Sequence, residues 1–185
     1  MKIICVSSSK GGVGKTTTSA NLGGIAADAG LKTLLIDLDG QPTLSSYFPL
    51  DYQAPGGTFD LLVHNVVAPE QIISRTNIPG LDIVLSNDPR NQLETLLLHA
   101  PDGRLRLRSL LKRLPHYDLV IIDTKGTTAV TVEMALIASD LALSPLVPEM
   151  LSAREFSRGT VALFAGVDQL RQTVGFGAPP LVVVN

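Results

Sequence analysis

The sequence predicts an α/β domain in which a mainly parallel sheet is covered by helices on both faces. Short apolar runs rich in β-branched residues alternate along the chain with stretches of helical periodicity, an arrangement typical of βαβ units. Several of these runs are hydrophobic throughout, as in strands that are buried on both sides. With 185 residues, of which 45% are hydrophobic, the chain has enough apolar material for a single domain with a sizeable core.

Six of the apolar runs are expected to form the strands of this sheet. They are short, most of their residues are apolar or β-branched, and helical patterns separate several of them. The expected strands are 2–7, 33–37, 81–85, 119–123, 141–146 and 181–184.

Three helices are expected between the strands. The first begins near Gly14 and ends before Gly30, because glycine commonly stops a helix at its C-terminus. The second spans 104–114 and turns its leucines inward, and the third spans 153–171. The inward stripe of the first helix is expected to comprise Leu22, Ile25 and Ala29.

Charge and cysteine content exclude several classes of protein. The chain carries 15 Lys and Arg against 17 Asp and Glu, a net charge of -2, which argues against a globally basic nucleic-acid coat but leaves room for a local basic patch. A single cysteine, Cys5, excludes a disulfide framework and a multi-cysteine metal centre within one chain. No apolar run approaches the roughly 18 residues of a membrane span, so a cytoplasmic location is expected.

A glycine-rich turn follows the first expected strand and opens the first expected helix. It ends in Gly14-Lys15-Thr16, the end of a Walker A motif, although Ser9 stands where the first glycine is usual. Backbone N–H groups at such a junction bind phosphate, Lys15 would reach the β- and γ-phosphates, and the Thr16 hydroxyl would bind Mg²⁺. The alternative is a tight turn without a ligand, which the flanking strand and helix disfavour. The expected phosphate-binding residues are Gly11, Gly12, Val13, Gly14, Lys15, Thr16 and Thr17.

Lys10 extends this motif to Lys-Gly-Gly-Val-Gly-Lys-Thr-Thr, which resembles the deviant Walker A motif of the ParA/MinD family of partitioning and positioning ATPases. The resemblance implies a P-loop NTPase fold and an ATP-sandwich dimer, in which Lys10 reaches the nucleotide of the partner subunit. A second cation near the γ-phosphate would stabilise the charge of the transition state, as an arginine finger does. A solvated lysine beside a glycine turn is the alternative.

Two further segments resemble motifs of this family. Residues 35–42 are similar to its switch I, which implies that Asp39 positions the attacking water and contacts the water shell of the metal; Asp37 is a weaker candidate for the same environment. A polar exit from a strand is the alternative. Residues 119–123 are typical of a Walker B strand, with Asp123 holding Mg²⁺ through water. The following Lys125 is unusual for the family and would reach phosphate, reach DNA or point into solvent.

The adenosine side of the site is expected near the last strands. Pro148 and Glu149 lie where members of the family contact the nucleoside, and Asn185 matches the asparagine that binds adenine there. An amide can pair with both N6 and N7 of adenine, although a terminal asparagine can equally be a simple strand end.

The basic cluster of the second helix is expected to be a solvated face. It comprises Arg104, Arg106, Arg108, Lys112 and Arg113.

The resemblance implies a slow, partner-stimulated, Mg²⁺-dependent ATPase that acts in DNA partitioning or in maintenance of a plasmid or integrative element. Residues 1–185 would be one nucleotide-binding domain that lacks the C-terminal elements of the family. Expected partners are a second copy of the chain, non-specific DNA and a ParB-type centromere-binding protein, with a nucleoid-associated location.

Three alternatives remain open. A MinD-like membrane-associated positioning ATPase would require a C-terminal amphipathic helix. A nucleotide-gated scaffold with little turnover would follow if Gly40 and Lys125 weaken catalysis. A reductase like the nitrogenase iron protein is disfavoured, because Cys5 lies in the first strand, where it cannot share a cluster between subunits.

Overall fold

A computed structural model describes residues 1–88, 90–114, 116–149, 154, 156–173, 175 and 181–184. Within these residues eight strands form one sheet in the order β3-β4-β5-β2-β6-β1-β7-β8. Six of them are parallel, and β3 and β4 add an antiparallel edge. The strands are β1 Lys2–Val6, β2 Thr33–Asp37, β3 Leu50–Tyr52, β4 Ser74–Thr76, β5 Leu81–Val84, β6 Leu119–Asp123, β7 Leu141–Pro145 and β8 Leu181–Val184.

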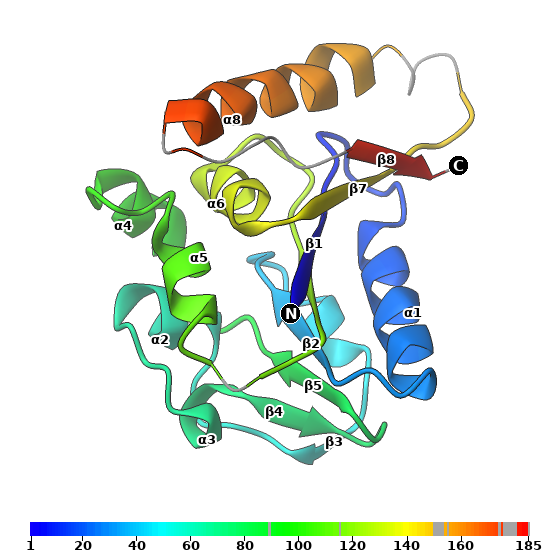
Figure 1. Ribbon diagram of the computed structural model, residues 1–185, viewed down its shortest axis with the longest axis vertical. Coiled ribbons are helices and arrows are strands. Elements are labelled where there is room, and N and C mark those ends of the chain that lie inside the picture. The colour runs from blue at the N-terminus through cyan, green and yellow to red at the C-terminus, as the bar shows by residue number, and fades with distance from the viewer. Residues whose placement is uncertain are drawn as a thin grey trace.

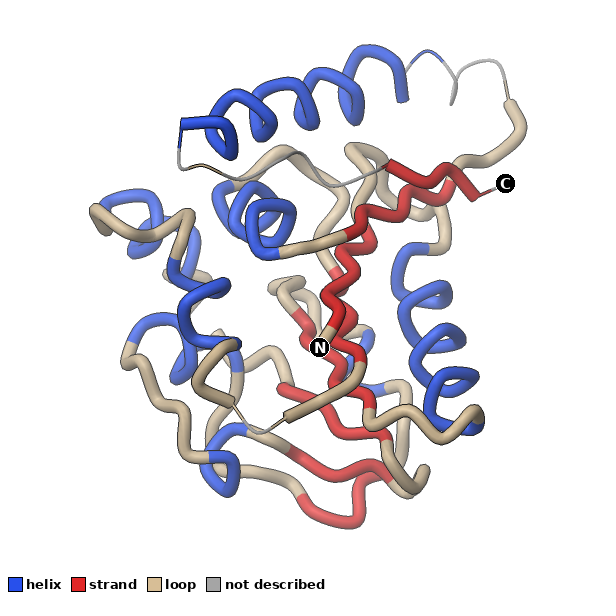
Figure 2. The backbone as a smooth tube through the Cα atoms, viewed as in Figure 1, coloured by secondary structure: helices blue, strands red, loops and turns tan. Residues whose placement is uncertain are grey.

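Helices cover both faces of the sheet (Figure 1), so the predicted fold class is confirmed. α1 lies against one face, and α2, α4, α5 and α6 lie against the other; Figure 2 shows the strands running between these two groups. No helix within the described ranges is long and apolar enough to cross a membrane. The helices are α1 Lys15–Asp28, α2 Thr58–Val63, α3 Pro69–Ile72, α4 Leu93–His99, α5 Arg106–Leu111, α6 Val130–Ala138 and α8 Val161–Thr173.

The central strands are buried along their whole length, as their hydrophobic sequences require. Every residue of β2 and β6 is buried. Their parallel register pairs Asp37 with Asp123, and on the other side of β6 Val6 of β1 also pairs with Asp123. The carboxyl ends of β1, β2 and β6 therefore meet at one edge of the sheet, where open α/β sheets bind their ligands.

The predicted inward stripe of α1 is confirmed only in part, since Leu22 packs against the core. Ile25 is 67% exposed and Ala29 is exposed, whereas the buried face carries small residues such as Ala20, Gly23 and Ala27. A Cβ on Gly23 would lie 2.8 Å from Leu35 Cδ2, so the helix rests closer to β2 than large side chains would allow. Gly30 does stop the helix, with φ +85° and its N–H donating to the Ala27 carbonyl.

The other expected helices are partly confirmed. The helix expected at 104–114 is α5, which is shorter at both ends. The described part of the helix expected at 153–171 consists of a π-helical turn, Phe156–Thr160, followed by α8; Ala153 lies outside the described residues. The antiparallel edge and several helices were not expected from the sequence, because β3 and β4 have only three residues each and α6 is buried on all sides. The unexpected helices are α2, α3, α4 and α6.

Candidate active site

The glycine-rich turn between β1 and α1 leaves its backbone open. Gly12 and Gly14 have φ of +72° and +88°, in the left-handed region that favours glycine. Around the positions where Gly11, Gly12 and Gly14 would carry a Cβ, no atom lies within 4 Å. Because α1 starts directly after Gly14, at Lys15, the turn and the first N–H groups of the helix form a site suited to phosphate.

Lys15 is held inside this turn. Its side chain is only 7% exposed, and Nζ donates to the Lys10 carbonyl at 3.0 Å. Burial lowers the pKa of the amine, and the carboxylates of Asp123 and Asp39 act in the opposite direction. The lysine therefore presents a desolvated positive charge at the centre of the loop.

Asp123 lies beneath the start of α1. Thr16 Oγ1 donates to Asp123 Oδ2 at 2.8 Å, and Ser19 Oγ donates to Oδ1 at 2.9 Å. Burial raises the pKa of Asp123, which the hydrogen bonds from Thr16 and Ser19 oppose, so a nearby cation would relieve the cost of the buried charge. A hydroxyl and a carboxylate side by side are the ligands that suit Mg²⁺ beside a bound phosphate. Ser19 was missed in the sequence, although its position three residues after Thr16 puts both on one face of the helix.

The two aspartates of the switch I segment have different places. Asp37 is fully buried and accepts hydrogen bonds from Ser45 Oγ at 2.7 Å, Ser45 N at 2.8 Å and Asp39 N at 3.1 Å. Burial raises the pKa of Asp37 to about 6. Asp39 instead lines the cavity beside the P-loop. Asp37 thus holds the loop in place, and Asp39 is the carboxylate that faces the cavity.

A cavity of about 780 Å³ lies over the P-loop, large enough for a nucleotide. The structure brings most of the expected phosphate-binding residues to it, together with residues of the three loops that follow β2, β5 and β6. They are Gly40, Gln41, Thr43, Asn91, Gly126 and Thr127, of which Gly40 and Gln41 lie in the segment that resembles switch I. The expected residues in its lining are Gly11, Gly12, Gly14, Lys15, Thr16, Thr17 and Asp39, joined by Lys125.

Several expected site residues do not line this cavity. Lys10 and Val13 belong to the turn but are not among the described lining residues, and Asp123 lies behind Thr16. Pro148 and Glu149 are exposed on the segment after β7 and are also absent from that lining. Asn185 lies outside the described residues.

Close backbone contact joins the P-loop to the loop after β6. A Cβ on Gly126 would lie 2.8 Å from both Cα and N of Gly11 and 2.8 Å from the Lys10 carbonyl oxygen. Only glycine permits this approach without moving one of the two loops. Lys125, which precedes Gly126, pairs with Glu94 rather than pointing into solvent.

Ser9, which replaces the usual first glycine, connects the P-loop to the π-helical turn that precedes α8. Its N–H donates to Thr160 Oγ1 at 3.2 Å, and the two hydroxyls lie 3.1 Å apart. Gly159 leaves room for this contact, since a Cβ there would lie 2.3 Å from Ser9 Oγ. The serine thus has a packing role that a glycine could not fill.

The basic cluster is not the solvated face that the sequence indicated. Arg104 pairs with Glu133 at 2.6 Å, and Arg106 pairs with Asp102. Arg108 Nη1 donates to the Ala138 carbonyl at 3.1 Å. Arg106 and Arg108 belong to α5 and Arg104 precedes it, and all three have partners. Two members of the cluster are exposed: Lys112 and Arg113.

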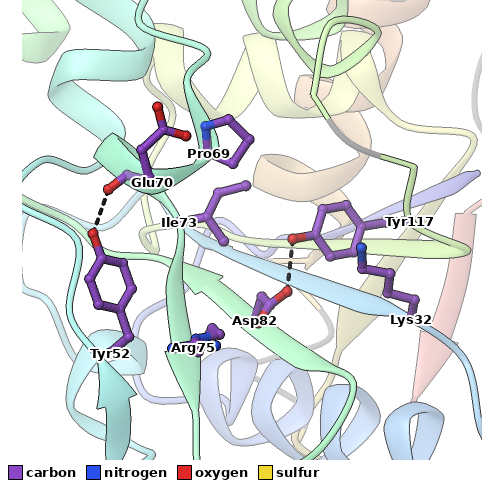
Figure 3. Close-up of a pocket in the computed structure, with 8 residues that line it drawn as sticks. All are labelled: Lys32, Tyr52, Pro69, Glu70, Ile73, Arg75, Asp82 and Tyr117. Carbon is purple, nitrogen blue, oxygen red and sulfur yellow. Dashed lines mark hydrogen bonds between the residues drawn. The ribbon is translucent and has the colours of Figure 1, made fainter.

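A second cavity, of about 490 Å³, lies near the amino ends of the parallel strands and has a different chemistry (Figure 3). Tyr52 and Tyr117 stand on opposite sides of it, with Ile73 between them. The Tyr117 hydroxyl donates to Asp82 at 2.9 Å, and the Tyr52 hydroxyl donates to the Glu70 carbonyl at 2.6 Å. With no glycine turn in its described lining, this cavity lacks the backbone donors of a phosphate site.

Comparison with known proteins agrees with this geometry. The family model described as an AAA domain matches residues 1–175. The chromosome partitioning protein ParA of Myxococcus xanthus is 32% identical over 160 residues, which cover 86% of this chain and 56% of that protein. The chain therefore spans little more than half the length of that relative.

Two solved structures share the fold. A plasmid partition protein of Borrelia burgdorferi B31, bound to AMPPNP, has a TM-score of 0.79 and 26% identity, covering 98% of this chain and 72% of that one. Cobyrinic acid a,c-diamide synthase of Mycobacterium smegmatis, bound to an ATP analogue and magnesium, has a TM-score of 0.84 and 27% identity, covering 99% and 72%. Together with the P-loop and its additional lysine, these matches identify the chain as a member of the ParA/MinD family of P-loop ATPases.

Proposed function

We propose that this chain binds and hydrolyses ATP with Mg²⁺, and that it acts in partitioning of a plasmid, an integrative element or a chromosome. The observation that carries the proposal is the Thr16–Asp123 pair, 2.8 Å apart directly beneath the turn that holds Lys15. A phosphate cradle, a buried cation and a hydroxyl–carboxylate pair are the parts that phosphoryl transfer needs.

Each residue has a role that its position supports. The turn amides and Lys15 hold the phosphates, and Thr16 and Asp123 would hold Mg²⁺, which neutralises phosphate charge when bound. Asp39, which lines the cavity, orients the attacking water and contacts the metal's water shell. The protein forms no covalent bond to the phosphate in this scheme, because phosphoryl-transfer sites work mainly by positioning and by electrostatic stabilisation.

The partners follow from the family. Relatives named for chromosome and plasmid partitioning support a role in DNA segregation, with non-specific DNA and a ParB-type protein as partners and a nucleoid-associated location. We further propose that ATP is bound between two subunits and that Lys10 reaches the partner's nucleotide. Pro148, Glu149 and Asn185 would contact the nucleoside.

Replacing Lys15 tests the ATPase proposal. Lys15→Ala should weaken nucleotide binding at least tenfold, because it removes the buried cation of the phosphate site. Binding is measured by titration with a fluorescent ATP analogue in Mg²⁺, and turnover by a single-turnover ATP assay with and without DNA. Full affinity and turnover in Lys15→Ala would refute the proposal. Tight binding by the wild type without turnover would point instead to a nucleotide-gated scaffold.

A further inference from the structure

Lys125 lies on the wall of the nucleotide cavity that faces the P-loop. It follows β6 by two residues, and the adjacent Gly126 touches the backbone of Gly11. Lys125, Gly126 and Thr127 all line the cavity. Within the described lining the positively charged side chains are those of Lys15 and Lys125, and Asp39 is negatively charged. A triphosphate entering this cavity therefore meets a second cation besides the P-loop lysine.

Glu94 pairs with this second cation. Lys125 Nζ lies 2.6 Å from Glu94 Oε1, and the same oxygen accepts a hydrogen bond from Thr131 Oγ1. Glu94 belongs to the first turn of α4 and Thr131 to the first turn of α6. The carboxylate thus fixes the lysine between two helices, at the edge of the cavity.

Lys125 can readily exchange Glu94 for another anion. The two side chains are 27% and 33% exposed, so water screens their attraction and the ion pair is weak. A polyphosphate offers a higher negative charge and several acceptor oxygens to the same ammonium group.

We propose that Lys125 recognises the terminal phosphate of the nucleotide bound by its own subunit, and that Glu94 competes with the phosphate for it. The inference rests on the proposed function, since it takes the cavity to hold a nucleoside triphosphate. Lys125 then distinguishes triphosphate from diphosphate, and α4 loses its contact with Lys125 when the lysine turns to the ligand.

Equilibrium binding tests the recognition step without any turnover. Fluorescent ADP and a fluorescent non-hydrolysable ATP analogue are titrated into wild type, Lys125→Gln and Lys125→Arg in Mg²⁺. Lys125→Gln should lose about tenfold in affinity for the triphosphate and less than about twofold for the diphosphate, and Lys125→Arg should stay within about threefold of wild type. Lys112→Gln removes the same charge from an exposed site on another surface and should change neither affinity.

A double-mutant cycle tests the competition. Glu94→Gln keeps an acceptor for Thr131 but frees Lys125, so triphosphate affinity should rise about two- to fivefold. In the Lys125→Gln background the same change should have no effect. An unchanged or lower triphosphate affinity in Glu94→Gln, or an equal gain in both backgrounds, would refute the competition between Glu94 and the phosphate. The comparison of Glu94→Gln with wild type requires only that the Glu94→Gln variant folds.

The outcomes separate this inference from the proposed function. If wild type binds neither nucleotide, the proposed function fails. If wild type binds, Lys15→Ala does not, and Lys125→Gln keeps the full preference for triphosphate, the role of Lys125 alone is refuted.

Discussion

Gly126 carries no side chain, and the backbone of the P-loop occupies the space that one would fill. The three atoms within 2.8 Å of its missing Cβ all belong to Gly11 and Lys10 backbone. Backbone atoms cannot turn aside as the end of a long side chain can, so a methyl group here must separate the two loops. Both loops line the cavity, which makes their contact part of the site rather than of the core.

At this residue we predict that Gly126→Ala lowers nucleotide affinity at least tenfold, because the P-loop and the opposite wall move apart. Titration with a fluorescent ATP analogue measures the change. Gly24→Ala is the matched control: no atom lies within 4 Å of its Cβ position, and as a helical glycine it should gain about 0.5–1 kcal/mol of stability with unchanged affinity. Wild-type affinity in Gly126→Ala would show that the contact is not needed.

At the scale of the elements, the C-terminal end of α6 is capped by a side chain of another helix. Eight of its nine residues are buried, so it has no polar face, and its last carbonyls lie in the interior. Arg171 of α8, only 5% exposed, donates to the carbonyls of Leu136 at 2.8 Å, Ile137 at 3.1 Å and Ser139 at 2.8 Å. A buried guanidinium thus satisfies carbonyls that water would bind at an exposed helix end.

Removing this contact should destabilise the fold. Arg171→Met keeps much of the apolar stem but takes the guanidinium away from three buried carbonyls, of which Leu136 keeps the Ser139 hydroxyl as a donor. The free energy of unfolding should fall by roughly 2–4 kcal/mol. Urea unfolding followed by circular dichroism measures the loss. Arg113→Met, at an exposed position after α5, should stay within about 0.5 kcal/mol of wild type. A loss no larger than that of the control would contradict the capping role of Arg171.

At the scale of the whole molecule, the site is assembled from one edge of the sheet. The carboxyl ends of β1, β2 and β6 bring together the P-loop, the Asp37–Asp39 segment and Asp123, while the second cavity lies near the amino ends of the strands. Lys10 belongs to this edge but is not part of the described cavity lining.

Mixing two inactive variants tests the proposed exchange of Lys10 between subunits. In a dimer of Lys10→Ala with Asp39→Ala, one site would have its own Asp39 and the partner's Lys10, and the other site would lack both. Random association should then restore about a quarter of wild-type turnover in an equimolar mixture. The readout is steady-state phosphate release, with each variant alone as the control. No recovery would mean that Lys10 acts within its own subunit.

Local patterns predicted the large features well and the small ones poorly. The strands β2 and β6 have the predicted limits, because a buried parallel strand is a continuous apolar run. The limits of β8 are also as predicted, although three of its four residues are exposed. The three-residue strands β3 and β4 are too short to show an alternation of apolar and polar residues. The inward face of α1 was predicted only in part: Leu22 packs against the core, but Ile25 is exposed because this helix is buried mainly through small residues.

The sequence by itself determined the parallel sheet, the P-loop and the family, since each depends on residues that are neighbours in the chain. Only the tertiary structure decided which side chains that are distant in the sequence contact each other. Thr16 and Asp123 are 107 positions apart, and Arg108 and Ala138 are 30 apart. Pairs like Lys125 and Glu94 likewise leave no periodic trace in the sequence. Their contacts exist only because the packed sheet and helices bring distant segments within hydrogen-bonding distance.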